Sequence, residues 1–68
     1  MPIGNNMRNI RVLRGLTQER LAKKAGLSRC TIVNFETGRR VPRVDDLAKI
    51  AEVMRVDVTV FFKDAKRN

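Results

Sequence analysis

The chain has 68 residues, so we expect one domain over residues 1–68 and no separate catalytic or ligand-sensing domain. It contains one cysteine and no histidine, so we expect no disulfide, no metal site and no cofactor. Fifteen basic residues outnumber seven acidic ones, which gives a formal net charge of +8. A domain this small is marginally stable alone, which favours self-association.

The excess of positive charge is confined to the first part of the chain. Residues 1–43 contain ten basic and two acidic side chains, whereas residues 44–68 contain five of each. This asymmetry predicts a polyanionic partner for the first part and a different task for the second.

No apolar run in the sequence has the length of a signal peptide or a membrane span. A single cysteine suits a reducing compartment. We therefore expect a cytoplasmic protein that does not bind membranes.

The first predicted helix covers residues 5–14. Met7 and Ile10 lie three residues apart, which places them on one helical face. Gly15 then ends the helix, because glycine readily adopts the left-handed conformation found after a last helical turn.

Two further helices follow, each preceded by a capping residue and followed by a glycine. Thr17 is a typical N-cap for the first of them, which ends at Gly26. Ser28 is the N-cap of the next helix, which covers residues 29–37 and ends at Gly38. The apolar face of the shorter helix consists of Leu21, Ala22 and Ala25.

A fourth helix begins after Pro42, because proline excludes a helix interior from residues 39–43. Asp45 and Asp46 lie in its first turn, where negative charge complements the helix dipole. Its broad apolar stripe comprises Val44, Leu47, Ala48, Ile50, Ala51 and Met54.

Residues 57–62 allow two interpretations. A strand is favoured by the alternation of Val56, Val58, Val60 and Phe62. The same segment is also compatible with a short helix that Asp57 caps and that buries Val58, Phe61 and Phe62. Residues 63–68 are expected to form a polar tail, which leaves a core region over residues 7–62.

The second and third helices are joined by Ala25-Gly26-Leu27-Ser28, which is the pattern of a helix-turn-helix motif. Gly26 permits the sharp turn, and Leu27 anchors the turn in the core. The second helix of such a motif lies in the major groove of DNA. At about 100° per residue, Thr31, Ile32 and Phe35 fall on the core side. The opposite face carries Arg29, Cys30, Val33, Asn34 and Thr37.

The chemistry of this outer face suits the reading of base edges. Arg29 matches guanine, Asn34 matches adenine, and Val33 matches the methyl group of thymine. With Cys30, these are the predicted base-reading residues. Three arginines follow in a loop placed to contact phosphates: Arg39, Arg40 and Arg43.

The segment from Thr17 to Arg29 resembles the XRE family of helix-turn-helix DNA-binding proteins, which includes phage repressors and Cro-like proteins. The likeness covers residues 7–62 and continues in register at Ile32, Glu36, Gly38, Arg40, Pro42, Leu47, Lys49, Ile50 and Ala51. It implies an all-α, lambda-repressor-like bundle of about five short helices, with short extended segments at the termini. It also implies operator binding as a dimer, and it favours the short helix for residues 57–62.

The resemblance assigns roles to individual residues. Gln18 matches a phosphate-binding glutamine of the family, while Arg11 and Glu36 match a buried ion pair that withdraws Arg11 from DNA. The further phosphate contacts that we predict are Thr17, Thr31 and Thr37.

The chain departs from the family pattern in several places. Arg43 replaces the usual N-cap of the fourth helix, and Arg55 stands where many relatives have glycine, which puts that helix end in doubt. Arg20 leaves only half of a capping box with Thr17. Cys30 replaces a common serine, and redox control through its thiol is a separate hypothesis.

These features predict a sequence-specific regulator of transcription, a repressor or an autoregulatory controller, that binds double-stranded DNA as a homodimer on an inverted repeat. The dimer contacts are predicted at Val58, Val60, Phe61 and Phe62. The alternative is a protein-interaction module, either an antitoxin or a domain that binds an anti-repressor. Enzymatic activity is not expected, because the chain lacks histidine and its adjacent carboxylates, Asp45 and Asp46, diverge along their helix.

Overall fold

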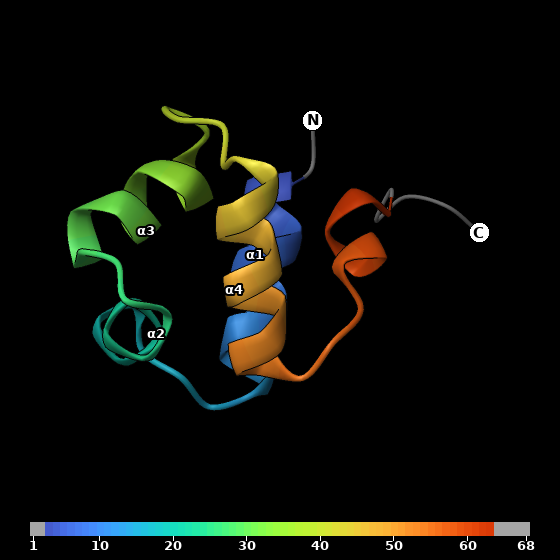
Figure 1. Ribbon diagram of the computed structural model, residues 1–68, viewed down its shortest axis with the longest axis horizontal. Coiled ribbons are helices and arrows are strands. Elements are labelled where there is room, and N and C mark those ends of the chain that lie inside the picture. Colours follow the sequence, from blue (N-terminus) through green and yellow to red (C-terminus); the bar gives the residue numbers. More distant parts are fainter. Residues whose placement is uncertain (1–2, 64–68) are drawn as a thin grey trace.

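The computed structural model describes residues 3–63, and over this range the chain is helical without a strand. The elements are α1 (Ile3–Leu13), α2 (Gln18–Ala25), α3 (Arg29–Thr37), α4 (Val44–Met54) and the short 3₁₀-helix η1 (Val58–Phe62), shown in Figure 1. The predicted all-α bundle of about five helices is confirmed. None of the helices between residues 3 and 63 has the length and apolar character needed to cross a membrane. The predicted polar tail lies outside the described residues except for Lys63.

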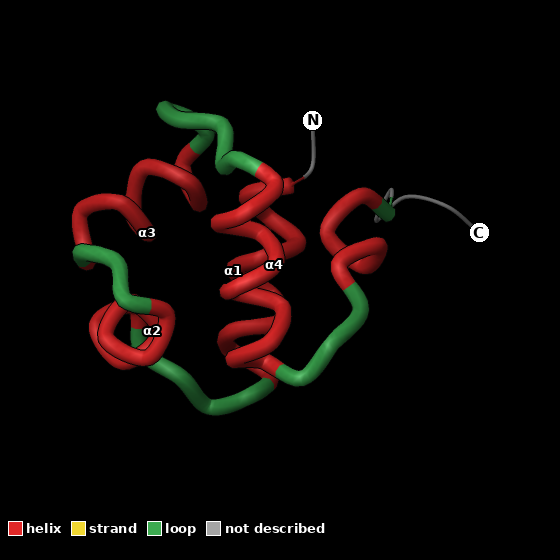
Figure 2. Tube along the Cα trace, in the orientation of Figure 1, coloured by secondary structure: helices red, strands yellow, loops and turns green. Residues whose placement is uncertain are grey.

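The helices form two groups on either side of a central pair. In the view of Figures 1 and 2, α1 and α4 occupy the middle, α2 and α3 lie on one side, and η1 lies on the other. Helix α1 packs against α3 and η1, while α2 packs against α3 and α4. The helix-turn-helix unit is therefore held by the central helices, with its outer surface open to solvent.

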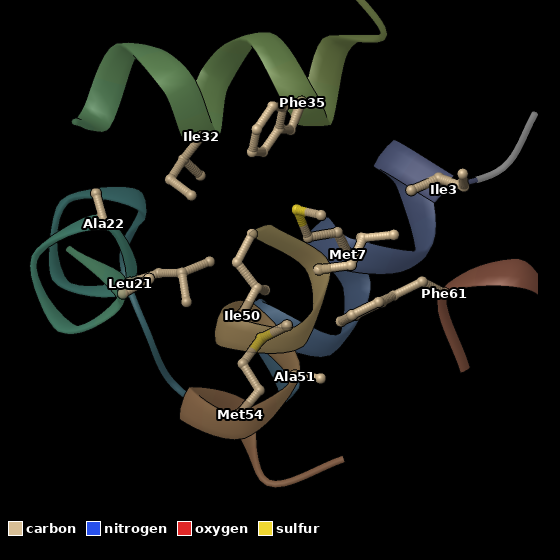
Figure 3. Close-up of a cluster of buried hydrophobic side chains, with 12 residues drawn as sticks. Ile3, Met7, Leu21, Ala22, Ile32, Phe35, Ile50, Ala51, Met54 and Phe61 are labelled. Carbon is tan, nitrogen blue, oxygen red and sulfur yellow. The ribbon is translucent and has the colours of Figure 1, made fainter. Parts of the chain in front are cut away.

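The core draws side chains from every element. Figure 3 shows them converging on the space enclosed by the helices. The largest side chains that are fully buried are Met7, Leu21, Ile32, Phe35, Ile50, Met54 and Phe61. Burial of one such side chain stabilises the fold by about 1.5–3 kcal/mol relative to leaving it exposed.

The ends of α2 and α3 follow the predicted capping chemistry. The Thr17 and Ser28 hydroxyl oxygens accept the backbone N–H three residues ahead, at 3.0 and 3.1 Å. Gly26 and Gly38 adopt left-handed φ values of 72° and 81° after the last turns. The boundaries of both helices are thus confirmed.

The boundaries of α1 differ from the prediction of residues 5–14. The helix begins at Ile3 and ends at Leu13. It starts early because Ile3 and Asn6 are buried against other elements, which fixes the first turn. The signal was present in the sequence, because Ile3 lies four residues before Met7 and continues the apolar face, but the prediction did not use it.

The strand interpretation of residues 57–62 is wrong. The segment is η1, and the Asp57 carboxylate accepts the Thr59 backbone N–H at 2.9 Å at its start. Phe61 is fully buried, whereas Phe62 remains 48% exposed. Consecutive residues of a tight helix point in different directions, so only one of the two rings faces the core.

Helix α4 buries a narrower stripe than predicted, because Val44 and Ala48 are exposed. Arg43 occupies its N-cap position without a side-chain capping bond. Arg55 ends the helix with a φ of 58°, in the left-handed region that glycine usually fills. The helix therefore ends where the family pattern implies, despite the residue type.

Candidate nucleic-acid interface

The turn between α2 and α3 fixes the angle between the two helices. Gly26 supplies the left-handed residue, and the Leu27 backbone N–H then donates to the Ala22 carbonyl oxygen at 2.8 Å. The Leu27 side chain is half-buried and packs against the core. The helix-turn-helix geometry predicted from Ala25-Gly26-Leu27-Ser28 is present.

Helix α3 has one buried face and one open face. Ile32 and Phe35 are buried, while Arg29 and Cys30 are exposed. Three further side chains of the predicted contacts are half-buried at the borders of the open face: Thr31, Val33 and Asn34. The four predicted base-reading residues thus share a surface that no other element covers within residues 3–63.

Asn34 links the open face of α3 to the loop that follows it. Its side-chain Nδ2 donates to the Cys30 sulfur at 3.8 Å. Its backbone carbonyl oxygen accepts the N–H groups of Arg39 and Arg40, at 3.0 and 3.2 Å. The position of the loop is therefore tied to the last turn of α3.

The loop between α3 and α4 carries the three predicted phosphate-binding arginines. Arg39, Arg40 and Arg43 are all exposed. The Arg40 guanidinium lies over the Phe35 ring, 5.6 Å from its centroid, a cation–π contact that holds one arginine beside α3. Positive charge therefore borders the open face of α3 at its C-terminal end.

The threonines predicted to contact phosphate differ in what they can donate. The Thr17 hydroxyl accepts from the Arg20 N–H, so its own hydrogen points elsewhere and suits a phosphate oxygen. The Thr37 hydroxyl instead donates to the Val33 carbonyl oxygen at 2.8 Å. A phosphate contact from Thr37 would require that bond to break. The Thr31 hydroxyl shares a hydrogen bond of 2.8 Å with Ser28.

The predicted ion pair of Arg11 and Glu36 is present. Arg11 Nε donates to Glu36 Oε2 at 2.7 Å, and Nη2 donates to Oε1 at 3.2 Å. The remaining guanidinium nitrogen, Nη1, donates to the Leu16 carbonyl oxygen at 2.8 Å. Each of the three Arg11 guanidinium nitrogens thus donates a hydrogen bond within the protein.

Gln18 belongs to the same network. Its Nε2 donates to Glu36 Oε1 at 3.1 Å, so one carboxylate gathers side chains from α1, α2 and α3. The sequence predicted a phosphate contact for Gln18 and did not predict this bond. In the structure one amide hydrogen of Gln18 is committed to Glu36.

Asn6 is a structural residue that the sequence did not single out. Its side chain is buried, and Nδ2 donates to the Phe61 carbonyl oxygen at 3.0 Å and also to that of Lys63. These bonds attach η1 to α1. The one signal in the sequence for this role was the position of Asn6 directly before Met7, an apolar residue of the predicted helix.

The predicted dimer contacts are not equivalent. Phe61 has no exposed surface, so its assignment to a dimer interface is wrong: the ring belongs to the core of its own subunit. Val58 and Val60 are half-buried, and Phe62 is half-exposed. Two further apolar side chains, Val12 and Leu13, are exposed at the end of α1.

The sequence matches the family model described as "Helix-turn-helix" over residues 7–61. It is similar to an uncharacterized HTH-type transcriptional regulator of Methanocaldococcus jannaschii, with 41% identity over 58 residues, which is 85% of this chain and 88% of the relative. It is also 28% identical over 64 residues to the cryptic phage CTXphi transcriptional repressor RstR of Vibrio cholerae, covering 94% of this chain and 58% of RstR. Among solved structures, Bacillus thuringiensis PlcR in complex with the peptide PapR7 and DNA aligns with a TM-score of 0.83 and 28% identity, over 98% of this chain and 24% of that chain.

Proposed function

Since the chain belongs to the helix-turn-helix family of DNA-binding transcriptional regulators, we propose that it is a repressor that reads an inverted-repeat operator as a homodimer. Proteins of this family act by binding DNA and are not enzymes. The similarity to the repressor RstR supports repression as the mode of regulation.

The observation that carries the proposal is the open face of α3. It presents the exposed guanidinium of Arg29 together with the half-buried Val33 and Asn34 side chains. Such groups distinguish base pairs in the major groove. The exposed arginines between α3 and α4 lie at the edge of this face, where contacts to phosphate position the helix without reading sequence.

Two subunits are needed because one helix of this length reads few base pairs. A symmetric dimer presents two copies of α3 about one turn of DNA apart, roughly 34–36 Å, and so reads an inverted repeat. Phe62, with the half-buried Val58 and Val60 beside it, supplies an apolar surface on η1. This surface belongs to η1, which the central helices α1 and α4 separate from α3 (Figure 1), so contacts through it leave the open face of α3 uncovered.

The proposal is tested by selecting bound sequences from random duplex DNA at about 150 mM salt, where non-specific binding is weak. We expect an inverted repeat with half-sites one helical turn apart. The affinity of the full site should fall with a log–log salt slope of about −7 to −9, the value for four to five phosphate contacts in each subunit. Absence of any enriched sequence would contradict the proposal, and an enriched single half-site would contradict its dimeric form.

A further inference from the structure

The first turn of α1 lies directly against the backbone at the end of α3. A Cβ atom placed on Gly4 would be 2.5 Å from the Phe35 carbonyl oxygen and 2.7 Å from that of Glu36. Carbon and oxygen atoms do not pack at these distances, and both neighbours are backbone atoms that no side-chain rotation removes. Only glycine fits at this position while α3 stays where it is.

The same turn is also attached to the end of η1, an element separate from α3. Ile3 and Met7 are buried in the core, and Asn6 donates to carbonyl oxygens at the end of η1. Gly4 and Asn6 are two residues apart and so face opposite sides of α1. The turn is therefore fixed from one side and forms the surface on which the end of α3 rests.

We propose that Gly4 is a positioning residue for operator reading, which acts through α3 and makes no contact with DNA. The inference rests on the proposed function. Gly4 contacts the last turn of α3, and in the same turn the Asn34 carbonyl oxygen holds the backbone of Arg39 and Arg40. A displacement of this end of α3 therefore moves a base-reading residue and the phosphate-binding loop together. Hydrogen bonds to bases tolerate shifts of only a few tenths of an ångström, so even a small displacement of α3 should weaken them.

The test compares Gly4→Ala with Val53→Ala in the full chain. Val53 is half-buried in the last turn of α4, which packs against α2 and η1, so the control loosens the core without placing any atom against α3. Both variants are studied at about 10 °C with sucrose, which favours the compact state, and circular dichroism checks that they are folded. Two quantities are measured: the ratio of operator affinity to affinity for random duplex, and the amide chemical shifts of the DNA-free protein.

We expect Gly4→Ala to lower the affinity ratio about tenfold, the effect of weakening one base contact, and to shift the amides of α3 and the following loop. Val53→Ala should change the ratio less than about twofold and leave the α3 amides in place. A wild-type ratio for Gly4→Ala would overturn the inference. So would a Gly4→Ala chain that stays unfolded under these conditions, because the contact would then serve stability alone. A failure of the proposed function is distinguished by the wild-type chain, which would then select no operator.

Discussion

Arg11 and Glu36 lie 25 residues apart in the sequence, yet their side chains meet through two hydrogen bonds, the shorter of them 2.7 Å long. The exposed fractions of the two side chains are 11% and 3%, so the pair is nearly withdrawn from water. With Gln18 on the same carboxylate, the pair joins α1, α2 and α3. The position of α3 therefore depends on one nearly buried ion pair.

Removing the Glu36 carboxylate should destabilise the fold strongly. In Glu36→Ala the Arg11 guanidinium stays buried without its counter-ion, which typically lowers the free energy of unfolding by about 3–5 kcal/mol. Urea denaturation near neutral pH measures this loss. Glu52→Ala, which removes an exposed acid from α4, should change stability by less than about 0.5 kcal/mol. Equal effects of the two substitutions would contradict the structural role of the pair.

Arg29 and Arg43 should contribute differently to DNA binding. Arg29→Ala should relax the preference at one position of each half-site, at about 1–3 kcal/mol, because a base contact is lost. Arg43→Ala should weaken binding to all sequences alike and flatten the salt slope by about one for each subunit. Titrations of the operator and of single-base variants at several salt concentrations separate the two effects. A uniform loss from Arg29→Ala would remove it from the base-reading residues.

Phe62 is the side chain that tests the predicted dimer. Because it is 48% exposed, Phe62→Asp should leave subunit stability within about 1 kcal/mol and should weaken self-association. Sedimentation at micromolar protein measures the association. Val12→Asp, at another exposed apolar site on α1, is the matched control and should leave association unchanged. Phe61→Asp does not serve this purpose, because it places a charge in the core.

Arg55 offers a stabilising substitution. It holds a left-handed φ of 58°, a conformation that disfavours every residue with a Cβ. Arg55→Gly should raise the free energy of unfolding by about 0.5–1 kcal/mol, because relief of strain exceeds the added freedom of the unfolded chain. Arg55→Ala keeps the Cβ and should give no such gain. Thermal denaturation of both variants decides whether strain or the lost arginine side chain is responsible.

Asp57 should make the free energy of unfolding depend on pH in the acid range. The Thr59 backbone N–H, followed by the Thr59 hydroxyl and the Lys63 ammonium, lowers the pKa of this carboxyl below its ordinary value of 3.8. The charged form therefore stabilises η1 above that value, and the contribution is lost as the pH falls through the lowered pKa. Asp57→Asn keeps an acceptor oxygen but does not titrate. The stability difference between wild type and variant should shrink with acidification, measured by urea denaturation from about pH 5 to pH 2.

Local chemistry explains how much of the fold could be predicted. The limits of α2 and α3 depend on a cap at Thr17 or Ser28 and a glycine after the last turn, all close together in the sequence. The partners of Asn6, by contrast, lie up to 57 residues away, and no local pattern identifies them. The start of α1 was missed for another reason: Ile3, Met7 and Ile10 have helical spacing, and the prediction overlooked Ile3.

The candidate interface was predictable in its placement and less so in its hydrogen bonds. Helical periodicity placed Arg29 and Cys30 on the open face, because one buried face implies an opposite one. The bond of Gln18 depends on where Glu36, 18 residues away, lies after folding, which residue type and spacing do not determine. The bond of Thr37 to the Val33 carbonyl oxygen is local, because a helical threonine commonly donates to the carbonyl four residues before it.

The position at which α1 begins also determines which end of the chain suits a fusion partner. Ile3 borders, with Phe35 and Arg40, the hollow between α1 and the arginine loop. A purification tag or fluorescent protein fused ahead of Ile3 would be located next to the surface proposed to face DNA. An acidic tag there would act as an intramolecular competitor for the arginines proposed to bind phosphate. A fusion after the chain's end lies beyond η1, which α1 and α4 separate from α3 (Figure 1), and suits DNA-binding assays better.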